Sequence, residues 1–286
     1  MFAQDEIKLL RNLQALIGVR YIYHENFKNH ATPNVALMYK PGKFNFRASY
    51  AAGFRTPTLS ELYATDIAKK NDRLTIGNLD LKPEKNNYFS LSAEYVHERF
   101  SVSVNAFYNN IRDMIDYNTI ATGDKAMEQY GHKEVRQRDN IAEAKVHGIN
   151  VSANAYLGAG FNLSGGYTHL NTQDVELEQP IDKSIKNAYN INAQWAHSWK
   201  IYRLNINLNG RFNSKRFSKS YGYAPEYQLW DLNTRHSFNL KSVIIEPGCG
   251  MENLFDYMDD RPYNSNYATL TPGRSFYISL SLKFKS

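Results

Sequence analysis

The stretch FNFRASYAAGF, Phe44–Phe54, alternates without a break between apolar side chains and polar or small ones. The even positions carry Phe44, Phe46, Ala48, Tyr50, Ala52 and Phe54, and the odd positions carry Asn45, Arg47, Ser49, Ala51 and Gly53. Successive side chains of a β-strand point to opposite faces of the sheet. The stretch therefore predicts a strand with one apolar face and one polar face.

The same period-two pattern recurs along the whole chain and predicts an all-β fold of about twelve strands. These strands are expected at residues 12–23, 33–40, 44–54, 87–97, 100–110, 145–157, 161–170, 188–197, 202–208, 228–239, 242–253 and 276–284. Their polar faces carry mostly Asn, Ser and Thr, which suits a wide or plugged lumen better than a tightly packed small barrel.

The connections between these strands alternate in length. Short turns are expected at 41–43, 97–99, 157–160, 197–200 and 239–241, and longer polar connections at 24–32, 55–86, 117–138, 171–187, 213–227 and 255–274. Short turns at one end and longer loops at the other are typical of a transmembrane β-barrel. A sandwich with Greek-key connections would not keep this alternation. We therefore predict a transmembrane antiparallel up-and-down β-barrel.

Composition agrees with a barrel and excludes other classes. The chain has 286 residues, and its mean hydropathy of −0.57 is too low for a bundle of membrane helices. A transmembrane barrel has this composition because only every second residue faces lipid. Many aromatic residues fall near strand ends, as in interfacial girdles, although the edge of a soluble sheet would look similar. The net charge of +6 comes from scattered Lys and Arg, so we do not expect nucleic-acid binding.

Two pairs of motifs resemble those of the TonB-dependent outer-membrane receptors. Residues 54–57, FRTP, and 78–84, NLDLKPE, are similar to the family's Phe-Arg-Ala-Pro motif and Asn-Pro-Asn-Leu box. The positions that carry this first match are Phe54, Arg55, Pro57, Asn78, Leu79, Leu81, Pro83 and Glu84. The C-terminal signature and assembly signal of the family match Asn253, Leu254, Phe255, Asp256, Gly273, Arg274 and Phe284.

The resemblance implies a location in the outer membrane of a Gram-negative bacterium. Receptors of this family have a 22-stranded barrel filled by an N-terminal plug that contacts TonB. Residues 1–286 would form the C-terminal part of such a barrel, with the signal peptide, the plug and the other barrel strands absent. Lipid, the missing barrel half and the plug would be its partners, and TonB would act only through the plug.

The function implied by the resemblance is active uptake of an iron complex, haem or siderophore, or of cobalamin. The candidate ligand contacts in the outer loops are Tyr117, Tyr130, His132, Tyr221, Tyr223 and Tyr263. Amphipathic tyrosine rings suit a large flat or macrocyclic ligand, although an interfacial belt would contain the same residues. Haem receptors of this subset usually carry an axial histidine between the two motifs, and residues 58–77 contain none. The cargo therefore stays open at this point.

Metal and enzyme hypotheses have weaker support. Three carboxylates cluster at Asp256, Asp259 and Asp260, but calcium takes six or more oxygen ligands, so we expect a solvated turn and no metal site. Ser152, Ser164 and His169 have no nucleophile motif around them, so an outer-membrane hydrolase is disfavoured and we predict a protein that is not an enzyme. A stand-alone twelve-stranded channel remains the main alternative.

Overall fold

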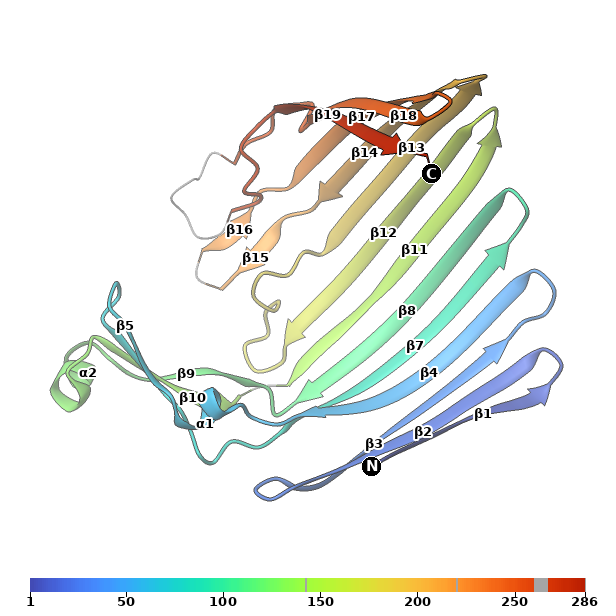
Figure 1. Cartoon of the computed structure of the whole chain (residues 1–286). Helices are drawn as coiled ribbons and strands as arrows, with labels where there is room; N and C mark the ends of the chain where they lie inside the picture. Colours follow the sequence, from blue (N-terminus) through green and yellow to red (C-terminus); the bar gives the residue numbers. More distant parts are fainter. Residues whose placement is uncertain (142, 220, 260–266, 286) are drawn as a thin grey trace.

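One 13-stranded antiparallel sheet dominates the structure (Figure 1). The computed structural model describes residues 1–141, 143–219, 221–259 and 267–285. The strands follow one another in chain order as β1-β2-β3-β4-β7-β8-β11-β12-β13-β14-β17-β18-β19, and the two edge strands do not pair with each other. The sheet is thus an open, curved wall, which confirms the antiparallel up-and-down topology.

The strands of the wall are 9 to 15 residues long. They are β1 (Phe2–Leu10), β2 (Leu13–His24), β3 (Lys28–Tyr39), β4 (Phe44–Arg55), β7 (Glu84–Val96), β8 (Phe100–Arg112), β11 (Ala144–Gly158), β12 (Phe161–Asp174), β13 (Asn187–Trp199), β14 (Tyr202–Asn213), β17 (Tyr227–Asn239), β18 (Val243–Glu252) and β19 (Ser275–Phe284). Neither helix of the described residues is long or apolar enough to cross a membrane.

All twelve expected strands are present, and the count of about twelve is one short because β1 was missed. Asp5, Glu6 and Lys8 break the alternation in this segment, so its sequence carries no clear strand pattern. Pairing with β2, from Phe2 opposite Arg20 to Leu10 opposite Leu13, makes it a strand. Backbone hydrogen bonding to the neighbouring strand β2 therefore determines that β1, at the edge of the sheet, is a strand.

The expected alternation of connection lengths is confirmed, with one exception. Figure 1 shows the tight turns gathered at one end of the wall and the long connections at the other. The exception is the expected loop 24–32, because β2 and β3 continue up to His24 opposite Lys28 and leave only a three-residue turn, 25–27.

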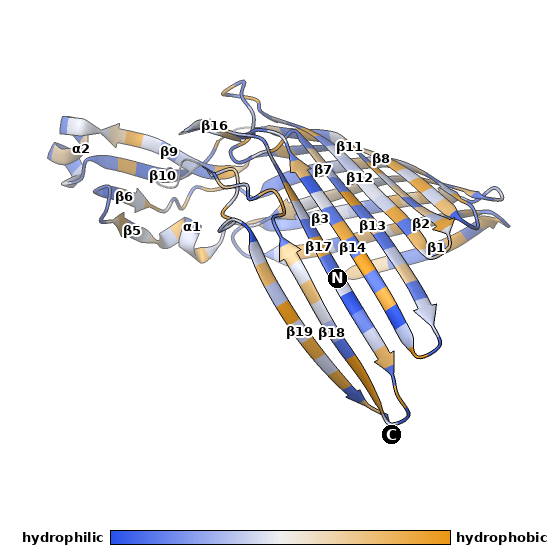
Figure 2. Ribbon diagram, turned by 90° about the horizontal axis from the view of Figure 1, so that it is seen from above, coloured by the Kyte–Doolittle hydropathy of each residue, from blue (hydrophilic) through white to orange (hydrophobic). Residues whose placement is uncertain are grey.

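The long connections are not plain loops, because several contain secondary structure of their own. The segment between β4 and β7 holds α1 (Leu59–Tyr63), β5 (Thr65–Ala68) and β6 (Arg73–Ile76). The segment between β8 and β11 holds β9 (Ile115–Thr122), α2 (Gly123–Tyr130) and β10 (Glu134–Asn140), and that between β14 and β17 holds β15 (Arg216–Ser218) and β16 (Gly222–Ala224). These elements project from one end of the wall (Figure 2).

Hydropathy alternates residue by residue along the strands (Figure 2). On the polar face, neighbouring strands are joined by side-chain hydrogen bonds, such as Ser49 to Ser90 at 2.6 Å and Ser103 to Ser152 at 2.7 Å. The opposite face exposes large apolar side chains, for example Leu91 and Val104. A folded wall of this kind requires a hydrocarbon environment on one side and a wet environment on the other.

Trp230 lies over a glycine on the apolar face. Gly210 stands opposite both Trp230 in β17 and Ile191 in β13. A Cβ atom at Gly210 would lie 2.6 Å from the Trp230 ring and 2.8 Å from the Ile191 side chain. A side chain at position 210 would therefore displace the Trp230 indole or the Ile191 side chain from its present place.

We expect Gly210→Ala to destabilise the wall by about 1–3 kcal/mol, because the added methyl displaces a packed indole. The measurement is urea unfolding of the protein in phospholipid vesicles, followed by tryptophan fluorescence. Gly165→Ala is the matched control, since its Cβ would have a single contact, at 3.3 Å, with the Asn190 carbonyl. Equal losses in the two variants would contradict the packing argument.

Candidate functional site

Two of the long connections fold together at the loop end of the wall. Strands β5, β6, β10 and β9 form a four-stranded sheet in that order, and the pairing of β6 with β10 is parallel. We call residues 56–83 and 113–141, which contain this sheet with α1 and α2, the loop body. Because its strands come from both connections, the loop body is one structural unit.

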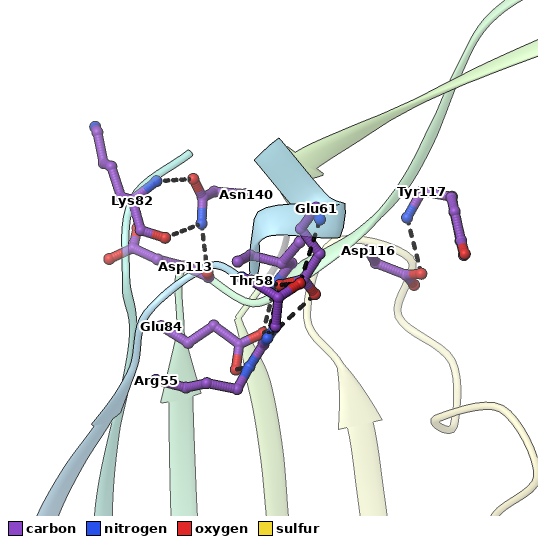
Figure 3. A network of polar contacts seen from close by, with 10 residues as sticks. Arg55, Thr58, Glu61, Lys82, Glu84, Asp113, Asp116, Tyr117 and Asn140 are labelled. Atoms are coloured by element: carbon purple, nitrogen blue, oxygen red, sulfur yellow. Dashed lines mark hydrogen bonds and ion pairs between the residues drawn. The ribbon is translucent and has the colours of Figure 1, made fainter. Parts of the chain in front are cut away.

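Arg55 connects the loop body to the wall (Figure 3). It is the last residue of β4 and pairs with Glu84, the first residue of β7. Its guanidinium donates to both oxygens of Glu84, at 2.8 and 2.5 Å, and to both oxygens of Glu61 in α1, at 3.1 and 2.9 Å. Glu84 also accepts the amide of Ile115 at 2.8 Å, at the start of the second connection. One cation and two carboxylates therefore join β4, β7, α1 and β9.

Helix α1 begins in a capping box. The Thr58 hydroxyl accepts the Glu61 amide at 3.2 Å, and Glu61 accepts the Thr58 amide at 2.8 Å. Such reciprocal bonds satisfy the free amides of a helix start. Leu62 of α1 then packs into a small buried cluster with Leu81 and Ile115, against which Phe27 also lies. The motif region thus folds by polar capping around a minimal apolar core.

Two further contacts hold the connections to each other. The Asn140 side chain accepts the Lys82 amide at 2.6 Å and donates to the carbonyls of Lys82 and Asp113 at 2.9 and 2.7 Å (Figure 3). His132 contacts Asp72 through its Nδ1, 2.9 Å from the carboxylate. The predicted ligand residue His132 is therefore engaged with the other connection.

These contacts shift the acidity of two loop carboxyls. Burial raises the pKa of Glu61, but hydrogen bonds from Arg55 and from Thr58 outweigh it, so this pKa lies below its ordinary value of 4.5. The hydrogen bond from His132 lowers the pKa of Asp72. Both groups are thus anionic at neutral pH, as the contacts with Arg55 and His132 require.

The motif residues predicted from the sequence are placed in and around this network. Pro57 and Pro83 are buried, and Leu81 is in the apolar cluster. Phe54 stacks on His30 with ring centroids 4.4 Å apart, and Asn78 accepts the Asp80 amide at 2.9 Å. Leu79, in contrast, is 65% exposed beside an open pocket of about 490 Å³. Apart from Leu79, these positions have contacts that build the loop base.

The predicted tyrosines are divided between the loop body and the hairpin of β15 and β16. Tyr117 lies on β9 and Tyr130 ends α2, both in the loop body. Tyr221 and Tyr223 are exposed in the hairpin of β15 and β16. Tyr263 lies outside the described residues. The described tyrosine candidates therefore lie in two separate parts of the structure.

Tyr117 has a cationic neighbour that the sequence did not indicate. Arg138 of β10 stands opposite it, with its guanidinium carbon 3.7 Å from the ring centroid and a 2.5 Å hydrogen bond to the tyrosine hydroxyl. Tyr117 as a whole residue is 41% exposed. A solvent-accessible ring under a guanidinium is a surface for flat anionic ligands. Cross-strand register, which only the folded loop body supplies, brings these two residues together.

The C-terminal signature forms a clamped turn after β18. The buried Asn253 side chain donates to the Tyr257 carbonyl at 2.8 Å and accepts the Tyr257 amide at 2.9 Å. Asp256 accepts the Arg274 amide at 2.7 Å, and Gly273 has a φ of 99°, which favours glycine. The Leu254 amide donates to the Trp230 carbonyl, while Phe255 and the terminal-strand Phe284 are exposed. Asn253, Leu254 and Asp256 therefore link β17, β18 and β19 at the loop end, whereas Phe284, opposite Val243, lies at the short-turn end.

Comparisons with known proteins agree with this architecture. A family model described as TonB dependent receptor-like, beta-barrel matches residues 1–254. The ferric enterobactin receptor PfeA from Pseudomonas aeruginosa superposes with a TM-score of 0.78 at 20% identity, covering 99% of this chain and 44% of that one. The siderophore receptor PirA from Acinetobacter baumannii gives 0.76 at 17% identity, with 99% and 45% covered, and the copper transporter OprC gives 0.76 at 12%, with 99% and 48% covered.

The chain belongs to the TonB-dependent receptor family, in its β-barrel domain. Receptors of this family lie in the outer membrane of Gram-negative bacteria, so the apolar face of the wall faces lipid. The chain spans less than half the length of each of these three solved structures.

We expect Arg55→Gln to loosen the loop body without unfolding the wall. The variant leaves Glu61 and Glu84 without their cation, and because Arg55 is 43% exposed the loss is about 1–2 kcal/mol. Proteolytic cleavage within residues 56–83 should accelerate on the order of 10-fold. Lys69→Gln, at an exposed position of the same connection, is the control and should cleave at the wild-type rate.

Low pH should weaken the contact between Arg55 and Glu61. Because the pKa of Glu61 is lower in the folded protein than in the unfolded chain, its contribution is complete above about pH 4.5 and is lost as pH falls through the folded value. Hydrogen exchange of residues 58–64, corrected for intrinsic rates, should rise over that range. In Glu61→Gln the rise should be absent or reduced, and an identical rise in both proteins would argue against Glu61 as the titrating group.

Proposed function

We propose that this chain supplies part of the barrel wall and of the outer loops of a receptor that takes up a ferric siderophore. The observation that carries the proposal is the accessible Tyr117 ring beneath the Arg138 guanidinium in the loop body. Siderophore receptors among the structurally similar proteins support this choice of cargo.

The chemistry of the pair fits an anionic aromatic chelate. Guanidinium groups bind flat anionic groups through paired N–H donors and stack on aromatic rings. Among the described residues, Arg138 has no carboxylate partner, so its charge is available to a ligand. Within the loop body, His132 is instead held by Asp72, so the Arg138 and Tyr117 pair is the better candidate for first contact.

In this proposal the loop body binds the chelate and the polar face of the wall lines its path. Ser, Asn and Glu side chains along that face, such as Asn45 bonded to Glu94 and Asn192 bonded to Asn207, present a hydrated surface. Energy for passage would come from TonB through a plug, in line with the family. The contacts of Arg55 and Asn140 hold the loop body, and with it Tyr117 and Arg138, at the loop end of the wall.

We expect Arg138→Gln to weaken binding of a ferric tris-catecholate on the order of 10-fold, because one charged contact is lost. Binding is measured as fluorescence quenching of the protein produced from its own gene in detergent. Lys125→Gln, which removes one exposed charge from α2 of the same loop body, is the matched control. Unchanged affinity in Arg138→Gln would overturn the assignment of this pair, and tighter binding of haem or cobalamin than of the chelate would overturn the cargo.

A further inference from the structure

Two cations stand directly opposite each other on the lipid-facing side of the wall. Lys85 of β7 pairs with Arg112 of β8, and both are exposed. Within the described residues, neither side chain has a hydrogen-bond or ion-pair partner. Like charges opposite each other in an antiparallel pair repel. The arrangement is therefore unfavourable unless an anion lies between them.

A third cation extends this pair along the sheet. Lys145 of β11 pairs with Asn110 of β8, two residues from Arg112 and on the same face. Its ammonium lies 3.8 Å from Glu143, a loose contact. We call Lys85, Arg112 and Lys145 the cationic cluster.

The cationic cluster lies at the height of the lipid headgroups. In the β4 and β7 pair, Phe44 opposite Tyr95 marks the short-turn end, and Phe54 opposite Lys85 lies at the loop end. Ten residues span about 33 Å along a strand, which becomes roughly 25 Å of membrane height at the usual barrel tilt. Since the apolar band of such barrels has about this height, Lys85 and Arg112 are at its outer boundary.

An apolar groove lies on the same strands below the cations. It has a volume of about 530 Å³, and its lining includes Val35, Leu37, Ala48, Tyr50, Leu91 and Ala106. Ala48 and Ala106 stand on either side of Leu91 in the register, so two small side chains open the groove. Tyr50 and Phe89, with ring centroids 4.9 Å apart, line the end of the groove that is nearer to the cations.

We propose that β4, β7 and β8 bind a phosphate-bearing lipid of the outer leaflet. Lys85 and Arg112 hold the phosphate, which relieves their mutual repulsion, and one acyl chain lies in the groove. An arginine fork with a neighbouring ammonium matches the oxygens of a phosphate group. A lipid would both neutralise the two cations with its phosphate and fill the apolar groove with an acyl chain. A soluble phosphate would only neutralise the cations.

The proposal is tested with phosphatidic acid that carries a photoreactive diazirine on one acyl chain. The protein is produced from its own gene, placed in phosphatidylcholine nanodiscs with the probe, irradiated and digested. Peptides covering residues 86–91 and 104–108 should be labelled on the order of 10-fold more by this probe than by the phosphatidylcholine probe with the same chain. Inorganic phosphate added in excess should not remove the labelling.

The variant with Lys85→Gln and Arg112→Gln should lose this preference and label equally with both probes. The control variant carries Lys43→Gln and Arg99→Gln. These substitutions also remove two positive charges, but at the short-turn end of the wall, where β4 and β8 begin. It should keep the preference for phosphatidic acid.

Three results would overturn the proposal. These are equal labelling of the wild-type protein by both probes, an undiminished preference in Lys85→Gln with Arg112→Gln, and complete competition by inorganic phosphate. The test is independent of the cargo, since no ligand of the loop body takes part in it.

Discussion

The constraint on which this structure depends is that backbone groups inside a hydrocarbon layer must pair with each other. Strands β4 and β7 meet it with unbroken pairing from Phe44 opposite Tyr95 to Arg55 opposite Glu84. The chain leaves the ladder only beyond that last pair, where water can satisfy its amides and carbonyls. The same two residues also form an ion pair through their side chains, and Glu61 and the Ile115 amide join it. The last residue pair of the β4–β7 ladder, Arg55 and Glu84, therefore also holds the loop body in place.

The loop body relies on polar contacts more than on a core of its own. Within the part of the chain that the structure describes, its buried apolar cluster contains Leu62, Leu81 and Ile115, and Ala126 and Val135 are buried outside that cluster. The position of its exposed face, with Tyr117 and Arg138, therefore depends on Arg55 and Asn140, which hold the two connections at the mouth. A small core with several charged contacts gives a unit that can open locally while the wall stays folded. Such a division suits a protein whose wall lies in lipid and whose loops, in our proposal, bind a ligand.

Much of the fold and part of the site follow from the sequence. Strict alternation in Phe44–Phe54 and its repeats predicted twelve wall strands, and connection length predicted which end carries the loops. The Thr58 and Glu61 spacing is a capping box that sequence inspection could have found, as it lies beside the FRTP motif. Strand β1 and the strands inside the long connections gave no clear signal, because backbone pairing with a partner strand creates them and side-chain alternation does not mark them. The contact of Asn140 with Lys82 spans 58 residues and has no local pattern.

The sequence by itself determined the two-faced strands, their order in an antiparallel wall and the family to which the chain belongs. Those properties are local, since side-chain direction in a strand repeats every two residues and strands that follow each other along the chain tend to lie side by side. Only the tertiary structure decided that Arg55 bridges two carboxylates, that Arg138 covers Tyr117, and that Lys85 faces Arg112 above an apolar groove. Each of these depends on cross-strand register or on the packing of separate connections. Register is set by the whole ladder, and no single stretch of the chain records it.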